Sequence, residues 1–409
     1  MTDTTLQSAA ALTGPWLAGA QALLGDAIAL RRRIHAHPEL GLQLPVTTAA
    51  VLDSLKGLDV EIDNGPSTSG LIVTLRGKPG RTVLLRGDMD ALPMPEDTGL
   101  PFASTQPGCM HACGHDSHTA MLSGAVRLLH NHRDRLQGTV KFMFQPGEEG
   151  HFGALRMIED GLLDKAPVPD GAFAIHITPN AKSGVFTSRH GPFMASTDTV
   201  DIKVWGKGGH ASAPHMALDP VPIACEIVTA LQTAITRRIS AFEPVVLTIA
   251  KIEAGTTSNV IPETVSMLGT LRALSEVSRK RAKLAITQVA EKIAEAHGAR
   301  AEVTLTEGYA VTVNDGRMVD LAAHAAKEIL GDAGYVTMSS PLMGAEDWAY
   351  VLHRIPGCMM FLGVAPEGAR YHTAAPCHSN RMVLNESAMA HGIALYAGVA
   401  ERFLANGFA

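Results

Sequence analysis

The segment His111–His118 reads His-Ala-Cys-Gly-His-Asp-Ser-His, and the pair Glu148-Glu149 follows further along the chain. A thiol and several imidazoles this close together suit zinc and related transition metals, and carboxylates can bridge two such ions or act as a base beside them. Of two adjacent glutamates, one can bind metal while the other moves protons. A fold for this chain therefore has to bring the two segments together, and the first hypothesis is a metallohydrolase.

Composition sets the scale of the molecule. At 409 residues the chain exceeds the usual single-domain range, so two domains are expected. Hydrophobic residues make up 46% and charged residues 18%, which is ordinary for a globular enzyme with a large core. A net charge of -6 gives no electrostatic reason to expect a nucleic-acid partner. The basic run Arg31-Arg32-Arg33 is interpreted as a solvated helix face.

Targeting signals and cysteine usage predict a cytoplasmic protein without a membrane partner. The chain has Asp3 and no Lys or Arg ahead of the apolar stretch 9–24, which argues against a signal peptide. The apolar helical candidate 222–235 contains Glu226 and is too short to span a bilayer. The five cysteines are odd in number and scattered, which suits reduced thiols and a metal ligand better than a disulfide framework.

Helical and strand patterns alternate in the first half of the chain. This alternation predicts an α/β fold with a mixed, mostly parallel sheet and helices on both faces. The expected helices are 18–34, 46–55 and one that begins near His115 and runs to 129, and the expected strands are 71–75, 82–85, 139–144 and 172–177.

Polar side chains follow three of these predicted strands. Asp88 and Asp90 come after the strand 82–85, Glu148-Glu149 come after the strand 139–144, and His176 lies at the end of the third. Ligands in open α/β sheets collect at the carboxyl ends of strands. We therefore expect these side chains to meet at one edge of the sheet.

Between residues 194 and 308 the rhythm changes. The βαββαβ order is the ferredoxin-like pattern, which predicts an inserted α+β domain over 194–308 and a discontinuous metal-binding catalytic domain over 1–193 and 309–409. The pattern consists of strands 199–205, 245–252, 265–271 and 301–305 with helices 221–239 and 275–297; a helix 318–330 and a strand 358–363 follow it.

Local context separates the candidate ligands. Gly114 permits a tight turn that brings Cys113 and His115 to one point, so both are interpreted as ligands, although an isolated buried cysteine is often inert. On local grounds alone His176 reads equally as a core histidine in an apolar strand. His378 has still weaker local support.

Seven motifs stand in fixed order between about residue 25 and the C-terminus. They are His35-Ala-His-Pro-Glu-Leu, Gly87-Asp-Met-Asp-Ala-Leu-Pro, Met110-His-Ala-Cys-Gly-His-Asp-Ser-His, Gln145-Pro-Gly-Glu-Glu-Gly, Gly206-Lys-Gly-Gly-His-Ala-Ser-Ala-Pro-His, Asn259-Val-Ile-Pro-Glu and Gly344-Ala-Glu-Asp-Trp. Together these motifs resemble the M20 peptidase/amidohydrolase family, and within it the branch of bacterial hippurate hydrolases and auxin–amino acid conjugate hydrolases.

The resemblance implies two divalent metal ions per subunit. Zinc is the expected metal, with manganese, cobalt or nickel as alternatives. Glu148 takes the position of the general base, Asp90 that of an acid which orients a ligand, and the role of Asp88 stays open. The implied ligands are Cys113, His115, Glu149, His176 and His378.

The resemblance also implies roles for the inserted domain as a lid and as the interface of a homodimer. His210 matches a donor to the substrate oxyanion, which in related enzymes crosses from the partner subunit; locally it reads as an ordinary loop histidine. Asn259 and Arg272 match positions suited to binding a substrate carboxylate. A surface ion pair is the alternative for Arg272.

The expected reaction is hydrolysis of the amide bond of N-acyl or N-aroyl amino acids, hippurate among them, to a carboxylic acid and a free amino acid. This places the protein among hydrolases acting on linear amides. A dipeptidase or carboxypeptidase and an aminobenzoyl-glutamate hydrolase are near alternatives. A non-catalytic ligand-binding relative and a redox-sensing cysteine protein are alternatives of another class.

Overall fold

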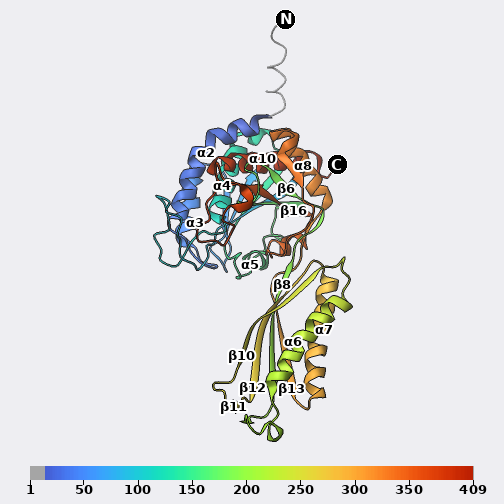
Figure 1. Ribbon diagram of the computed structural model, residues 1–409. Coiled ribbons are helices and arrows are strands. Elements are labelled where there is room, and N and C mark those ends of the chain that lie inside the picture. The colour runs from blue at the N-terminus through green and yellow to red at the C-terminus, as the bar shows by residue number, and fades with distance from the viewer. Residues whose placement is uncertain (1–13, 409) are drawn as a thin grey trace. The chain divides into compact units, whose positions relative to one another are not determined.

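The structure is a computed structural model that describes residues 14–408 (Figure 1). The start of the apolar stretch used above to argue against a signal peptide lies outside these residues. The chain forms two compact units. The first includes the chain up to Gly191, Val313–Ser339 and the chain from Tyr350 onward, and the second includes Pro192–Thr312 and Ser340–Ala349.

The first unit is built on an eight-stranded sheet in the order β1-β2-β4-β3-β5-β16-β6-β15. Its central strands β4, β3, β5 and β16 are parallel to one another, as the alternating pattern predicts. These four strands are buried along almost their whole length, so both faces of the sheet are covered. The strands are β1 (Glu61–Asn64), β2 (Leu71–Arg76), β3 (Arg81–Asp88), β4 (Gly138–Gln145), β5 (Gly171–Thr178), β6 (Phe186–Ser188), β15 (Tyr335–Thr337) and β16 (Gly357–Gly363).

The helices of this unit join the sheet in one hydrophobic core. Helix α10 was not predicted, because its apolar residues surround the helix instead of forming one stripe; it is buried on nearly every side. The main helices are α2 (Gly14–His35), α3 (Pro45–Ser54), α4 (His115–Asn131), α5 (Gly153–Glu159), α8 (Gly316–Leu330) and α10 (Met389–Asn406).

The second unit has the βαββαβ order expected of a ferredoxin-like domain. Its antiparallel sheet runs β10-β12-β8-β13, and β8 alternates buried and less buried residues because one face packs on two helices. A two-stranded pair, β9 and β11, adjoins it. The elements are β8 (Ser196–Trp205), β9 (Gly209–His210), α6 (Pro220–Arg238), β10 (Val245–Ala254), β11 (Val260–Ile261), β12 (Thr264–Ala273), α7 (Glu276–Ala296) and β13 (Arg300–Glu307).

The two helices of the second unit begin at well-formed caps. Asp219 accepts a hydrogen bond from the backbone N–H of Val221 ahead of α6, whose first residue is Pro220. Ser275 caps α7 in the same way through the N–H of Ser278. The two helices begin within one residue of the predicted starts at 221 and 275.

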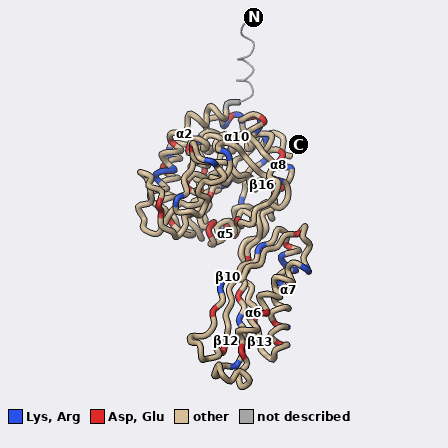
Figure 2. Tube along the Cα trace, in the orientation of Figure 1, with Lys and Arg blue, Asp and Glu red and all other residues tan. Residues whose placement is uncertain are grey.

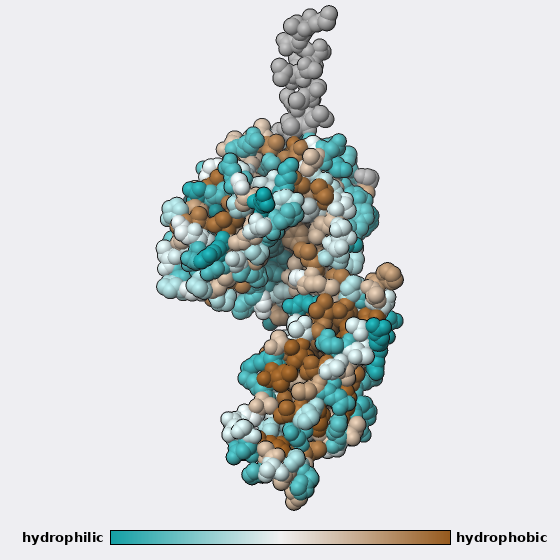
Figure 3. Space-filling model, in the orientation of Figure 1, coloured by the Kyte–Doolittle hydropathy of each residue, from teal (hydrophilic) through white to brown (hydrophobic). Residues whose placement is uncertain are grey.

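The distribution of charged and hydrophobic residues bears on which partners the protein can bind. Charges of both signs are interspersed along the trace of both units (Figure 2). Hydrophobic residues gather on the visible face of the second unit (Figure 3). None of the helices among residues 14–408 is long and apolar enough to cross a membrane.

Candidate metal centre

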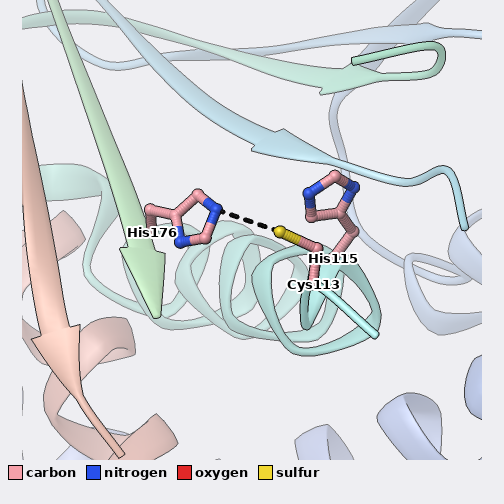
Figure 4. Close-up of side chains that lie close together, drawn as sticks. All are labelled: Cys113, His115 and His176. Atoms are coloured by element: carbon pink, nitrogen blue, oxygen red, sulfur yellow. Dashed lines mark hydrogen bonds between the residues drawn. The ribbon is translucent and has the colours of Figure 1, made fainter. Parts of the chain in front are cut away.

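The turn between Cys113 and His115 places both side chains beside the end of β5. Gly114 has φ +83°, and a Cβ there would lie 2.6 Å from Cγ1 of Ile177, so only glycine fits. Figure 4 shows Cys113 and His115 at the start of α4, and the Cys113 Sγ lies 3.4 Å from Nε2 of His176. All three side chains are buried. The short motif and the strand end thus converge, as the sequence predicts.

The five predicted ligands fall into two overlapping groups. Cys113, His115 and His176 each offer one ligand atom within 4.8 Å of the others, and so do Cys113, Glu149 and His378. Cys113 is shared by both groups. The backbone N–H of His378, a residue with φ +67°, donates to the carbonyl of Ala112 at 2.8 Å, which anchors its loop beside the cysteine. This donor set of thiolate, imidazole and carboxylate fits divalent zinc or its neighbours.

His115 gives an independent test of that fit. Its ring is fully buried, and neither nitrogen makes a hydrogen bond within the described chain. Nε2 lies 3.5 Å from Asp88 Oδ2, and Nδ1 lies 3.4 Å from Asp90 Oδ1. Burial favours the neutral ring, but Asp88, Asp90 and Glu149 outweigh it and raise the pKa of His115 to about 10. These carboxylates favour positive charge at this position, which a metal ion bound to the ring would supply in place of a proton.

Asp90 organises the glutamate pair. Its two carboxylate oxygens accept hydrogen bonds from the backbone N–H groups of Glu148 at 3.0 Å and Glu149 at 2.9 Å. Both Asp90 and Glu148 are almost fully buried. One carboxylate therefore fixes the backbone of the predicted base and of a predicted ligand at once, while it also faces His115.

Asp88, whose role the sequence left open, belongs to a buried network with His118. Its Oδ1 accepts from His118 Nδ1 at 2.5 Å, and its Oδ2 pairs with Arg86 Nη1 at 2.7 Å. Burial alone would raise the pKa of the Asp88 carboxyl, but Arg86 and the two histidines hold it well below its usual value. The N–H of Ile177 donates to His118 Nε2 at 2.8 Å, so the network holds the strand end beside His176.

His118 was not singled out from the sequence as a functional residue. Its spacing of three residues from His115 on one helix was the available signal, because such positions lie on the same face. It also forms a group of potential ligand atoms with Asp88 and His115.

Arg31 corrects the interpretation of the basic run as a solvated face. Its side chain is 2% exposed, and its Nε donates to Asp116 Oδ2 at 2.9 Å. The same oxygen lies 2.8 Å from His35 Nδ1, and His35 Nε2 lies 3.1 Å from Glu96. Burial lowers the pKa of His35, but Asp116 and Glu96 together raise it to about 9. The cluster ties α2 to the first turn of α4, where the ligand His115 stands.

The remaining predicted residues lie in the second unit. Ala211 N–H donates to the carbonyl of Asn259 at 3.1 Å, so His210 and Asn259 are neighbours across β9 and β11. The backbone N–H of Ser212 donates to His210 Nδ1 at 3.1 Å. An N–H can only donate, so the neutral ring carries its proton on Nε2, which is exposed as a donor.

Arg272 lies at the opposite end of the same sheet. It pairs in register with Thr197, near the start of β8, whereas His210 follows the end of β8 at Trp205. The span from Thr197 to Trp205 is roughly 27 Å at ~3.4 Å per residue. A single copy of the second unit cannot bring His210 and Arg272 to one small substrate.

Comparison with known proteins identifies the family. Residues 84–402 match the family described as Peptidase family M20/M25/M40. The chain belongs to this family. Thermostable carboxypeptidase 1 from Saccharolobus solfataricus is 39% identical over 92% of this chain and 95% of its own length. An IAA-amino acid hydrolase from Arabidopsis thaliana is 37% identical over 92% of this chain and 85% of its own length.

The fold has close counterparts among solved structures of this M20 family. A dinuclear metal-binding peptidase from Bacillus subtilis superposes with a TM-score of 0.81 and 34% identity, covering 94% of this chain and 99% of that one. The family and the ligand cluster, of which Cys113, His115 and His176 are buried, together support a metal-dependent hydrolase.

Proposed function

We propose that this M20 protein hydrolyses the amide bond of N-acyl or N-aroyl amino acids, with two divalent metal ions bound in the first unit. The convergence of Cys113, His115, Glu149, His176 and His378 beside Glu148 carries this proposal. The solved peptidase from Bacillus subtilis, described as dinuclear, supports the number of ions. The IAA-amino acid hydrolase supports an amide of an amino acid as substrate.

We propose that each of the two ligand groups holds one ion. Cys113 is shared, His115 and His176 complete one group, and Glu149 and His378 complete the other. Zinc is the proposed metal because of the thiolate ligand. When bound, such ions lower the pKa of water towards ~7 and polarise the substrate carbonyl.

Glu148 is the proposed general base. It takes the proton from the attacking water and later gives it to the leaving amine, so no other group has to supply that proton. Asp90 keeps its backbone in place through the amide hydrogen bond. Burial around Glu148 restricts bulk water and strengthens the electrostatic contacts of the reacting groups.

His210 and Arg272 are proposed to act on one substrate from two copies of the chain. Nε2–H of His210 would donate to the developing oxyanion, and Arg272 of the other copy would bind the carboxylate of the amino-acid product. Asn259, the neighbour of His210 across β9 and β11, would reach that carboxylate from the same copy as His210. Their separation along β8 supports a homodimer in which each site uses both copies. Strand β10 is an open sheet edge, and Val246 and Ile252 on it are 42% and 51% exposed, which suits pairing with a second copy.

Other substrates of the same chemistry remain alternatives. The carboxypeptidase relative favours a carboxypeptidase or dipeptidase as the second candidate, because a peptide also presents an amide next to a carboxylate. An aminobenzoyl-glutamate hydrolase differs only in the acyl group. The free state of all five cysteines supports the proposed cytoplasmic location.

The deciding experiment is hydrolysis over a panel of N-acetyl, N-benzoyl and dipeptide substrates, with chelated protein supplied again with zinc or manganese. Release of a free amino acid only after metal addition is the expected result. Faster cleavage of dipeptides than of every N-acyl amino acid would favour the peptidase candidate. Two bound ions without turnover of any substrate would contradict the proposal and favour a binding protein.

A further inference from the structure

A cavity of about 320 Å³ lies between α2, α3 and α4 in the first unit, outside the metal centre. Helices α2 and α4 run in opposite directions and meet at both ends. At one end a Cβ on Gly19 would lie 2.6 Å from Leu128, and at the other end Arg31 bonds to Asp116. The cavity lies between these two contacts, and its lining includes Ala27 of α2 and Ala120 and Gly124 of α4.

The cavity has an apolar wall and a charged rim. Leu23, Ala27 and Leu30 of α2 and Ala120 of α4 form much of the wall. This division of the lining is typical of sites that bind a small molecule through an apolar body and a few polar groups. The rim contains Asp26, Arg33, Asp53 and Arg127.

Two charged side chains on this rim, one of each sign, have no ion-pair partner among residues 14–408. Arg33 and Asp53 pair with each other at 3.0 Å. Arg127 donates one hydrogen bond to the carbonyl of Ser54, at the end of α3, and no carboxylate of the described chain pairs with it. The side chain of Asp26 has no hydrogen bond or ion pair with residues 14–408. The cavity therefore offers a half-buried guanidinium and an exposed carboxylate, neither of which has an oppositely charged partner among residues 14–408.

Ser123 supplies a second, independent observation. Its side chain is 5% exposed, and its hydroxyl has no hydrogen-bond partner within the described chain. It lines the cavity one helical turn before Arg127, on the same side of α4. A buried hydroxyl without a partner is unfavourable, and a ligand oxygen in the cavity would satisfy it.

We propose that this cavity is a binding site for a free α-amino acid with an apolar side chain. Its carboxylate would bind Arg127 and Ser123, its ammonium group would bind Asp26, and its side chain would pack on Leu23 and Leu30. The volume lies at the lower end of the range of about 300–1,000 Å³ for small-molecule sites. A free amino acid is also the product of the proposed hydrolysis, and that link alone rests on the proposed function.

The test is isothermal titration of the metal-loaded, full-length protein with four probes. L-Leucine and L-phenylalanine carry both charges, 4-methylpentanoate carries only the carboxylate, and 3-methylbutylamine carries only the ammonium group. Both amino acids are expected to bind, and each single-charge probe is expected to bind at least tenfold more weakly than leucine. Equal binding of leucine and 4-methylpentanoate would overturn the proposal.

Variants separate this site from the metal centre, which can also bind the product. Arg127→Met and Asp26→Asn should each weaken leucine binding at this site about tenfold or more while turnover stays unchanged. Arg402→Met, on a half-buried arginine of α10 that pairs with Glu328 outside the cavity, is the matched control and should bind as the wild type does. If Arg127→Met does not fold, Ser123→Ala and Asp26→Asn still test the site, because Asp26 is exposed and its substitution should leave the fold intact.

Unchanged leucine binding in both Arg127→Met and Asp26→Asn would refute the site. The titration does not depend on turnover. An enzyme that cleaves no amide can still show the site, and an active enzyme can still lack it, so the two proposals fail separately.

Discussion

The Asp90 carboxylate accepts a hydrogen bond from the backbone amide of Glu149 at 2.9 Å. Through its other oxygen it holds the neighbouring residue, the proposed base, in the same way. A single buried acid thus fixes the spacing between a proposed metal ligand and the group that moves protons. A change at Glu148 should therefore affect proton transfer, whereas a change at Asp90 should affect metal affinity.

Glu148→Gln should retain both metal ions and lose activity by about 10²–10⁴-fold, because the amide cannot take up the proton. Metal content by elemental mass spectrometry and kcat on the best substrate check this outcome. Glu159→Gln, on an exposed glutamate of α5, is the control and should keep wild-type activity. Full activity in Glu148→Gln would exclude it as the base.

Asp90→Asn should lower metal affinity by about 10–100-fold, since groups that orient metal ligands typically contribute this much. The asparagine side chain keeps one acceptor oxygen but places an NH₂ group opposite a backbone N–H. Metal titration against a chromophoric chelator measures the loss. Partial recovery of kcat at saturating metal is expected; unchanged affinity would show that the hydrogen bonds of Asp90 are dispensable.

Cys113→Ala should lose metal and activity together, because the thiolate belongs to both ligand groups. In the wild type, Cys113 should react with a thiol reagent only after chelation. Cys225 is the internal control, because it is exposed and free and should react with or without metal. Wild-type occupancy of both ions in Cys113→Ala would contradict its role as a ligand.

Mixing His210→Ala and Arg272→Met subunits tests the shared site. Each variant alone should be nearly inactive. If both copies contribute to each site, an equimolar mixture that exchanges subunits should recover about a quarter of wild-type activity, because half the dimers are mixed and each has one intact site. Recovery by the mixture is measured as initial rate after subunit exchange. No recovery, despite heterodimers seen by native mass spectrometry, would place both residues in one copy.

The contribution of His35 to stability should depend on pH. Its pKa in the folded protein is raised to about 9, from about 6.5 when unfolded, so protonation stabilises the fold fully below pH 6.5. This stabilisation is lost as the pH rises through about 9. His35→Asn should therefore lower the urea midpoint markedly at pH 6 and much less at pH 9.5, as followed by circular dichroism. An equal loss at both pH values would contradict the charged pairing with Asp116.

The sequence by itself predicted the central strands of the first unit and the βαββαβ order of the second, although it missed α10. These predictions rest on strong local signals, among them the alternation along β8 and Gly114 within Cys-Gly-His. The positions of Asp90 and Glu148-Glu149 after buried strands predicted their convergence, because parallel strands end at one edge of a sheet.

Only the tertiary structure decided which side chains that are distant in the chain contact one another. His176 and His378 were ambiguous locally, since their meaning depends on Cys113 and Glu149, which are distant in the chain. Arg31, predicted to lie on a solvated face, is buried beside Asp116, and Asp88, whose role the sequence leaves open, contacts His118 and Arg86. The state of a buried charge depends on partners that are distant in the chain, so local spacing does not reveal it. The separation of His210 from Arg272 depends likewise on the sheet that joins their strands.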